Sequence, residues 1–226
     1  MAITHVVYNK LKLRQANQIA AVALAADTLK IALCTSAYTP NIDTHEFYTD
    51  LIAAATVAIT SSSVAAAAVI TTAAVHGLTS GDQVLIAGHT GSTPAINGSY
   101  VATVLTTTTF SIPVTTTVGG TGGTVAKSSE ILGSGGYTVG GKALTTKVVA
   151  IDTAGDFAYL GADNVLWTAL TPSAAFRYGV LFKDTGVAST SPLISYVNFG
   201  VDENPAGSDF SLIWPAATSG GVLKVA

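Results

Sequence analysis

Charged residues are distributed very unevenly along this chain of 226 residues. Between Leu51 and Ala126 the only charged side chain is Asp82, whereas charged residues recur at ordinary spacing from Lys127 to Lys224. A change in composition this sharp often marks a domain boundary. Because charged sequence lies on both sides of the neutral stretch, we interpret this stretch as a module inserted into another domain.

The placement of this module divides the chain into three parts. We predict an inserted domain over residues 52–127 and a host domain formed by residues 29–51 and 128–226. Residues 1–28 are expected to be an N-terminal arm, with a helix over residues 9–26 because this segment is rich in Ala, Leu, Lys, Arg and Gln.

Short runs of Val, Ile, Thr and aromatic residues, separated by Gly, Pro, Asn and Asp, follow in both domains and are typical of strands. The prediction is therefore an all-β fold. We expect a β-sandwich in the host domain and a small barrel-like β domain in the insert.

The composition limits the kinds of partner. Only 10% of the residues are charged, compared with about 25% in an average soluble protein. The formal net charge of −3 and the absence of a large basic patch argue against nucleic acid as a specific partner. A weakly charged surface suits a protein that packs against other proteins. No run of apolar residues approaches the length of about 20 that spans a bilayer, so no membrane partner is expected.

Two sequence motifs could indicate chemistry, but each has a simpler interpretation. Asp184-Thr185-Gly186 is the tripeptide of aspartic proteases, which need two such carboxylates. It occurs once here, and a second copy would have to come from a homodimer, so a hairpin turn is favoured. The glycine clusters 119–123 and 133–141 are not followed by the Lys-Ser or Lys-Thr pair of a phosphate loop. We therefore predict no catalytic residue and no cofactor.

A loop with several acidic residues leaves two alternatives open. Asp43, His45 and Glu46 lie within four residues of one another, and Asp50 follows. Such a loop could bind a divalent cation. The favoured alternative is a solvated loop or a subunit contact, so we predict no metal site.

Positive charge is concentrated on the expected first helix. Lys10, Lys12 and Arg14 either form a solvated face or dock onto an acidic neighbour. We name these three residues as candidate partner contacts.

The two flanking pieces together resemble a family of structural proteins from tailed bacteriophages. The similarity is carried by KIALCTSAYTPNIDTHEFYTDL (30–51), SEILGSGGYTVGGKAL (129–144), ADNVLWT (162–168), FRYGVLFKDTG (176–186), SPLISYVNFG (191–200) and FSLIW (210–214). In that family the first piece runs almost directly into the second, so the resemblance also implies an insertion.

The inserted segment resembles a different domain. HGLTSGDQVLIAGHTGS (76–92) and INGSYVATVLTTTTFSI (96–112) are similar to the small FCCH-type β domain of the ubiquitin-activating enzyme, whose relatives recur in virion proteins. This likeness implies a fold and an assembly surface rather than an activity. It also implies that His76 stabilises a turn by a hydrogen bond.

Together these resemblances imply a non-enzymatic protein of the phage virion, assembled in the host cytoplasm. The first expectation is a capsid decoration or cement protein that forms a symmetric homo-oligomer, expected to be a trimer, and contacts the major capsid protein or other virion proteins. The alternatives are a structural protein of the tail, collar or fibre base, and a module that binds host glycans.

Overall fold

The computed structural model describes residues 4–17, 22–133, 135–216 and 219–225. These residues form mostly antiparallel β-structure with one α-helix, which confirms the all-β prediction. Contacts divide the chain into two compact units. We call residues 1–50 with 133–226 the host unit, and residues 51–132 the inserted unit. The N-terminal segment thus belongs to the host unit.

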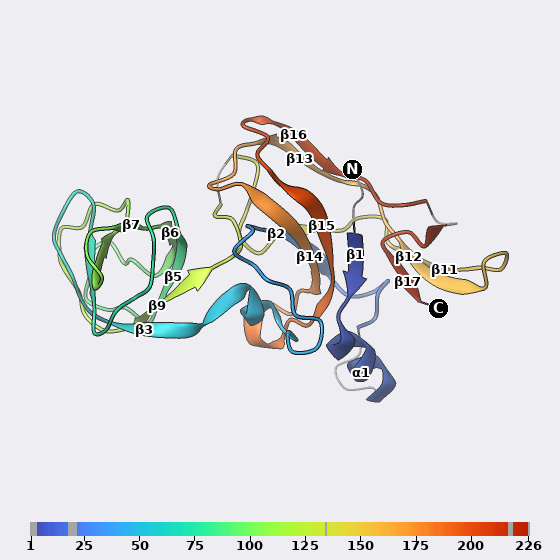
Figure 1. The fold of residues 1–226 in the computed structure, drawn as a ribbon, viewed down its shortest axis with the longest axis horizontal. Helices are drawn as coiled ribbons and strands as arrows, with labels where there is room; N and C mark the ends of the chain where they lie inside the picture. The colour runs from blue at the N-terminus through green and yellow to red at the C-terminus, as the bar shows by residue number, and fades with distance from the viewer. Residues whose placement is uncertain (1–3, 18–21, 134, 217–218, 226) are drawn as a thin grey trace. The chain divides into compact units, whose positions relative to one another are not determined.

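The centre of the host unit is a five-stranded antiparallel sheet in the order β1-β15-β14-β2-β10 (Figure 1). Its strands are β1 (Thr4–Val7), β2 (Leu29–Cys34), β10 (Lys142–Ala143), β14 (Phe176–Lys183) and β15 (Leu193–Glu203). β2 and β14 are buried along most of their length. This burial explains their nearly continuous apolar sequences, because a strand covered on both faces has no need to alternate polar and apolar residues.

Two smaller sheets complete the host unit. One contains β11 (Val148–Asp152), β12 (Phe157–Gly161) and β17 (Leu223–Val225), and the other contains β13 (Val165–Leu170) and β16 (Ser208–Leu212). Short 3-10 helices lie at Tyr48–Leu51 and Ala188–Thr190. The ring of Phe210 on β16 packs edge-to-face against Phe176 and Phe199 of the central sheet. Aromatic packing between two sheets gives the host unit its sandwich-like core.

The helix is shorter than the sequence predicted. α1 runs from Asn9 to Asn17, residues 18–21 lie outside the described part, and the chain from Val22 is no longer helical. The Gln15 side chain accepts a hydrogen bond from the Val22 N–H and donates one to the Val22 carbonyl. The side chain of Asp27 accepts the N–H of Ala23. These hydrogen bonds satisfy backbone groups outside a helix, so local side-chain hydrogen bonds compete with helix formation in this segment.

The inserted unit is one seven-stranded sheet in the order β6-β5-β9-β3-β4-β8-β7. Its strands are β3 (Ile52–Ser62), β4 (Val69–Thr72), β5 (Gln83–Ala87), β6 (Gly98–Val101), β7 (Thr103–Val104), β8 (Thr109–Ser111) and β9 (Thr124–Ser128). β6 and β7 stand at opposite ends of this order, yet only Ala102 separates them in the chain. The sheet must therefore curl until its two ends meet (Figure 1).

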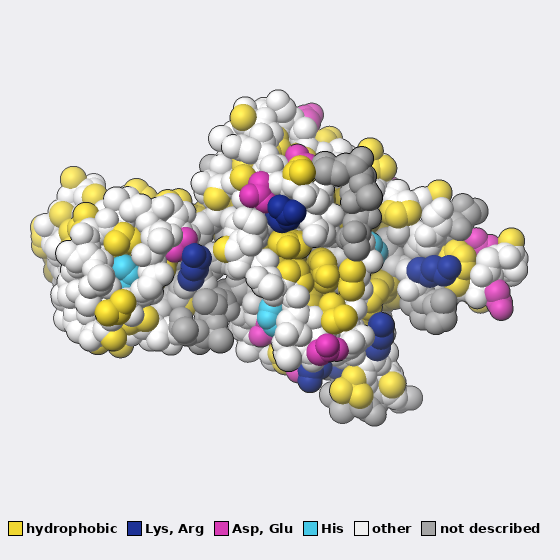
Figure 2. Space-filling model, in the orientation of Figure 1, with side chains coloured by type: hydrophobic (Ala, Val, Ile, Leu, Met, Phe, Trp, Pro, Cys, Tyr) yellow, Lys and Arg dark blue, Asp and Glu magenta, His cyan; other side chains and the backbone are white. Residues whose placement is uncertain are grey.

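The curled sheet encloses an apolar core. Among the side chains that the structure describes, this core contains ten buried residues: Ile59, Ala68, Ile70, Val84, Ile86, Ile96, Ala102, Phe110, Ile112 and Val125. The polar surface of this unit is supplied by Thr, Ser, Asn and Gly, because the segment contains very few charged side chains. The visible surface of this unit is accordingly almost uncharged in Figure 2.

The one charged residue of the neutral stretch is paired within the inserted unit. The Lys127 Nζ of β9 lies 2.7 Å from an Asp82 carboxylate oxygen, and the Thr79 N–H donates to the same carboxylate. Burial alone would raise the pKa of Asp82, but these hydrogen bonds outweigh it and hold the pKa below its usual value. Asp82 is therefore a charged anchor of the turn that precedes β5.

Candidate functional site

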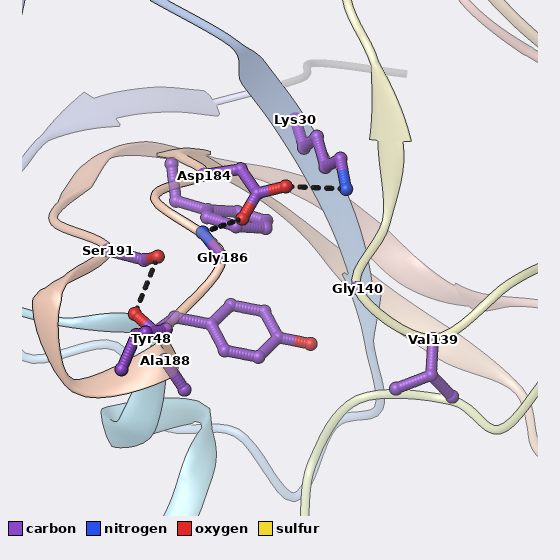
Figure 3. Close-up of a pocket in the computed structure, with 10 residues that line it drawn as sticks. Lys30, Tyr48, Val139, Gly140, Asp184, Gly186, Ala188 and Ser191 are labelled. Carbon is purple, nitrogen blue, oxygen red and sulfur yellow. Dashed lines mark hydrogen bonds and ion pairs between the residues drawn. The ribbon is translucent and has the colours of Figure 1, made fainter.

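A hollow of about 230 Å³ opens beside the connection between β14 and β15 (Figure 3). It lies within the host unit. It is lined by Lys30, Tyr48, Val139, Gly140, Phe182, Asp184, Gly186, Val187, Ala188 and Ser191. Its volume is below the range of about 300–1,000 Å³ that small-molecule sites usually have. The hollow is therefore better suited to one side chain or a small apolar group than to a whole substrate.

An ion pair forms one wall of this hollow. Lys30 Nζ lies 2.6 Å from Asp184 Oδ2, and the Gly186 N–H donates to Asp184 Oδ1 at 2.9 Å. The hydrogen bond from Lys30 is the largest of the effects that hold the pKa of Asp184 below its usual value. Asp184 is thus a carboxylate at neutral pH, and Figure 3 shows it turned toward Lys30.

This arrangement does not suit acid–base catalysis of the aspartic-protease kind. That chemistry needs two carboxylates that share one proton. Asp184 is the only carboxylate among the ten lining residues, and a lysine holds it ionised. The tripeptide Asp184-Thr185-Gly186 lies where the chain leaves β14 to return as the antiparallel strand β15, as predicted for a turn.

The hydroxyl of Ser191, a further polar group of the hollow, serves the loop itself. Ser191 Oγ donates to the Val187 carbonyl at 2.9 Å and accepts the Thr185 N–H at 3.1 Å. The ten lining residues include no histidine or cysteine that could activate this hydroxyl. The Tyr48 and Phe182 rings, 4.6 Å apart between centroids, form the apolar side. The arrangement can receive an apolar group beside a fixed charge pair.

Replacing Asp184 with asparagine is expected to lower the free energy of unfolding by up to about 1 kcal/mol at pH 7, because partly exposed ion pairs contribute little. The folded-state pKa of Asp184 lies below the unfolded value of about 3.9, so the wild type has this stabilisation above that pH and loses it as the pH falls further. Urea unfolding at pH 7 and pH 3, followed by tryptophan fluorescence, measures the difference.

The control for this experiment is Asp202→Asn. Asp202 pairs with Arg177 at a longer distance of 3.4 Å on a more exposed surface, so its replacement should have a smaller effect. A deficit of the Asp184→Asn variant that is equally large at pH 3 and pH 7 would contradict the assigned ion pair.

The three candidate partner contacts on α1 are not equivalent. Arg14 Nε donates to Glu46 Oε1 at 2.8 Å, and its guanidinium lies 4.6 Å from the centroid of the Phe47 ring. Arg14 therefore connects α1 to the loop that follows β2. Lys10 is half-buried, and Lys12 is exposed. The prediction of a docking role therefore depends on Lys10 and Lys12, because Arg14 already has an acidic neighbour within the host unit.

The acidic loop is held by separate hydrogen bonds. Asp43 Oδ1 accepts from Asn9 Nδ2 at 2.7 Å, His45 Nδ1 lies 3.0 Å from the Tyr38 hydroxyl, and Glu46 pairs with Arg14. Each side chain is directed to a different partner, so the loop does not collect them around one point. Within the described residues, no group of three or more His, Cys, Asp and Glu side chains could hold a metal ion. The side chains of this loop are therefore not arranged as a set of ligands around a divalent cation.

The histidines of the inserted unit have structural roles. His76 Nδ1 accepts the Leu78 N–H and Nε2 donates to the Thr106 carbonyl, each at 3.0 Å, which confirms the predicted turn-stabilising hydrogen bond. His89 is buried, and its Nδ1 donates to the Gly122 carbonyl at 2.7 Å while its Nε2 contacts the Ser62 hydroxyl at 3.0 Å. Both rings thereby connect segments that are distant in sequence.

Sequence reasoning missed the partners that decide these roles. Lys30 and Asp184 are separated by most of the chain, and only the pairing of β2 with β14 brings them together. Glu46 was considered as a metal ligand, although it pairs with Arg14. No local sequence signal reports either pair.

Comparison with known proteins does not add an assignment. No protein-family model matches the chain, and no match was found among curated proteins. No helix within the described ranges has the length and apolar character that crossing a membrane requires.

Proposed function

We propose that this protein is a non-enzymatic structural component of a tailed-bacteriophage virion and that it decorates and cements the capsid. The observation that carries the proposal is the number of large apolar side chains that strands and loops expose in a weakly charged protein. The most exposed are Ile151 at 72%, Ile213 at 66% and Val75 at 65%. The resemblance of the flanking pieces to phage structural proteins supports the same conclusion.

Such a surface favours contacts with protein. Isolated exposed apolar residues are ordinary, but neighbouring ones mark interaction surfaces. Val148, Val149 and Ile151 are exposed within a single strand, and further exposed apolar residues occur in both units. Hydrophobic side chains are conspicuous beside a small number of charged groups on the face that Figure 2 shows. Burying this surface against a neighbour would contribute about 25 cal/mol for each Å² of apolar area.

In the proposed mechanism, each copy acts through contacts alone. Apolar burial and strand pairing between copies, and between copies and the major capsid protein, reinforce the shell against the pressure of the packaged DNA. The hollow beside Asp184 fits this role, because it could receive a side chain of a neighbouring subunit. Assembly would take place in the host cytoplasm, where capsid proteins meet.

Glycan binding has less support. The inserted unit contains two aromatic residues, Tyr100 and Phe110, and a sugar-binding platform needs exposed aromatic faces. Phe110 is fully buried in the core, and Tyr100 is half-buried. The aromatic surface left for a sugar ring is therefore small.

A reconstruction of the virion that contains this protein tests the proposal. Capsid decoration predicts copies in the hundreds that follow the symmetry of the shell. Six to a few dozen copies at one vertex would instead place the protein in the tail, collar or fibre base. Absence of the protein from purified particles would contradict both locations.

Reversing the charge of Lys10 and Lys12 together is expected to weaken incorporation into particles about tenfold or more, because like charges opposed across an interface are strongly unfavourable. Quantitative mass spectrometry of purified particles measures the occupancy. The matched control replaces both lysines with glutamine, which removes attraction without adding repulsion and should have an intermediate effect. Unchanged occupancy of a folded charge-reversed variant would show that these lysines do not dock.

A further inference from the structure

The outer edge of β11 is unusual for a protein surface. β11 is an edge strand of the three-stranded sheet β11-β12-β17, and the β11–β12 hairpin reaches out from the rest of the host unit in Figure 1. Val148, Val149 and Ile151 are 50%, 48% and 72% exposed. Exposed edge strands usually carry a lysine, a proline or a bulge that prevents pairing. Residues 148–151 contain none of these, and their pairing with β12 is regular.

The register of the sheet shows which backbone groups face outward. The Val222 N–H donates to the Leu160 carbonyl at 2.7 Å, so the backbone groups of Leu160 on β12 face β17. Val149 pairs with Leu160, and Ile151 pairs with Ala158, whose other neighbour is β17. Because backbone groups alternate in direction along a strand, those of Val149 and Ile151 face away from β12. No hydrogen bond to these groups occurs among the described residues.

We propose that β11 pairs in antiparallel orientation with β11 of a second copy of this chain, about a two-fold axis at Ala150. In this register Val149 of each copy lies opposite Ile151 of the other. The outward N–H and C=O groups of both residues then form four hydrogen bonds, and the Val and Ile side chains pack as cross-strand pairs. The two sheets become one sheet of six strands.

The pattern of apolar side chains favours a second copy in this orientation. Val149 and Ile151 lie on the same face of β11, so in the antiparallel register each copy places an exposed apolar side chain opposite one of the other copy. The same patch serves both copies, which is the isologous contact expected of a two-fold dimer. The inference rests on the self-association in the proposed function and names its surface, but it does not depend on a place in the virion.

A single cysteine at the proposed axis tests the pairing. Ala150 would form a non-hydrogen-bonded pair with Ala150 of the second copy, at a Cα separation of about 4.5 Å, which a disulfide can bridge. We expect Ala150→Cys to become a covalent dimer under mild oxidation of the full-length protein. The native Cys34 is buried and should not interfere.

Val149→Cys is the matched control. Its thiol would face Ile151 of the second copy rather than another Val149, so it should cross-link far less on a non-reducing gel. In analytical ultracentrifugation the wild-type protein should sediment as a reversible dimer. The Ile151→Asp variant should sediment as a monomer, and circular dichroism should show that it is folded. A monomeric wild type, or equal cross-linking of both cysteine variants, would overturn the proposal.

These outcomes separate the pairing from the proposed function. Dimers that cross-link at Ala150 in a protein absent from particles would reject the virion role and keep the β11 contact. A protein that decorates particles without dimerising or cross-linking at Ala150 would keep the virion role and reject the contact.

Discussion

Replacing Phe176 with alanine is expected to lower the free energy of unfolding of the host unit by about 3–5 kcal/mol. Phe176 on β14 is fully buried. Its ring centroid lies 5.8 Å from that of Phe199 and 4.9 Å from that of Phe210, both in edge-to-face geometry. Truncation would remove both contacts and leave a cavity at the junction of two sheets, which packed neighbours cannot fill without shifting.

Denaturant unfolding followed by tryptophan fluorescence isolates this effect. The two tryptophans of the chain, Trp167 and Trp214, both belong to the host unit. Val201→Ala is the control, because Val201 lies on the neighbouring strand β15 but is exposed, and its loss should change stability by less than about 0.5 kcal/mol. Equal effects of the two substitutions would show that the aromatic cluster is not the core of this unit.

Replacing Phe110 with alanine is expected to destabilise the inserted unit by a similar amount, about 3–5 kcal/mol. Phe110 is fully buried in the core of the curled sheet, and its ring packs edge-to-face with His76 at 5.6 Å between centroids. Small domains bury a smaller fraction of their surface, so the same loss is a larger share of their stability. We expect the inserted unit of this variant to be largely unfolded under mild conditions.

Hydrogen exchange read by mass spectrometry locates this loss. Peptides from residues 51–132 should exchange much faster in the Phe110→Ala variant, while peptides from β2 and β14 should keep their protection. Leu105→Ala is the control, because Leu105 belongs to the same unit but is exposed. Unchanged exchange in residues 51–132 would contradict the assignment of Phe110 to the core.

The strands of the host sheet were the part of the fold most readily predicted. The sequences of β2, β14 and β15 contain long apolar runs because these strands are largely buried, and a buried strand carries apolar residues at consecutive positions. The helix end was not predictable in this way. Most of residues 9–26 are good helix formers, and hydrogen bonds between the side chains of Gln15 and Asp27 and the backbone of Val22 and Ala23 lie where the helix has already ended.

The candidate site was less accessible to sequence reasoning. Its turn at Asp184 could be predicted from local residue types, but the charge state of Asp184 depends on Lys30 in another strand. Arg14 looked like a free cation because its partner Glu46 is distant in sequence. Side-chain partners are set by the register of strands and loops, which local composition does not encode.

The sequence by itself determined the all-β class, the low charge and the position of the neutral segment. These properties follow from residue type and spacing, which act locally. Only the tertiary structure decided that Arg14 and Asp184 are internally paired and that the outward backbone groups of β11 belong to Val149 and Ile151. The physical reason is that ion pairs and unpaired sheet edges arise from strand register, which places residues together that the sequence keeps far apart.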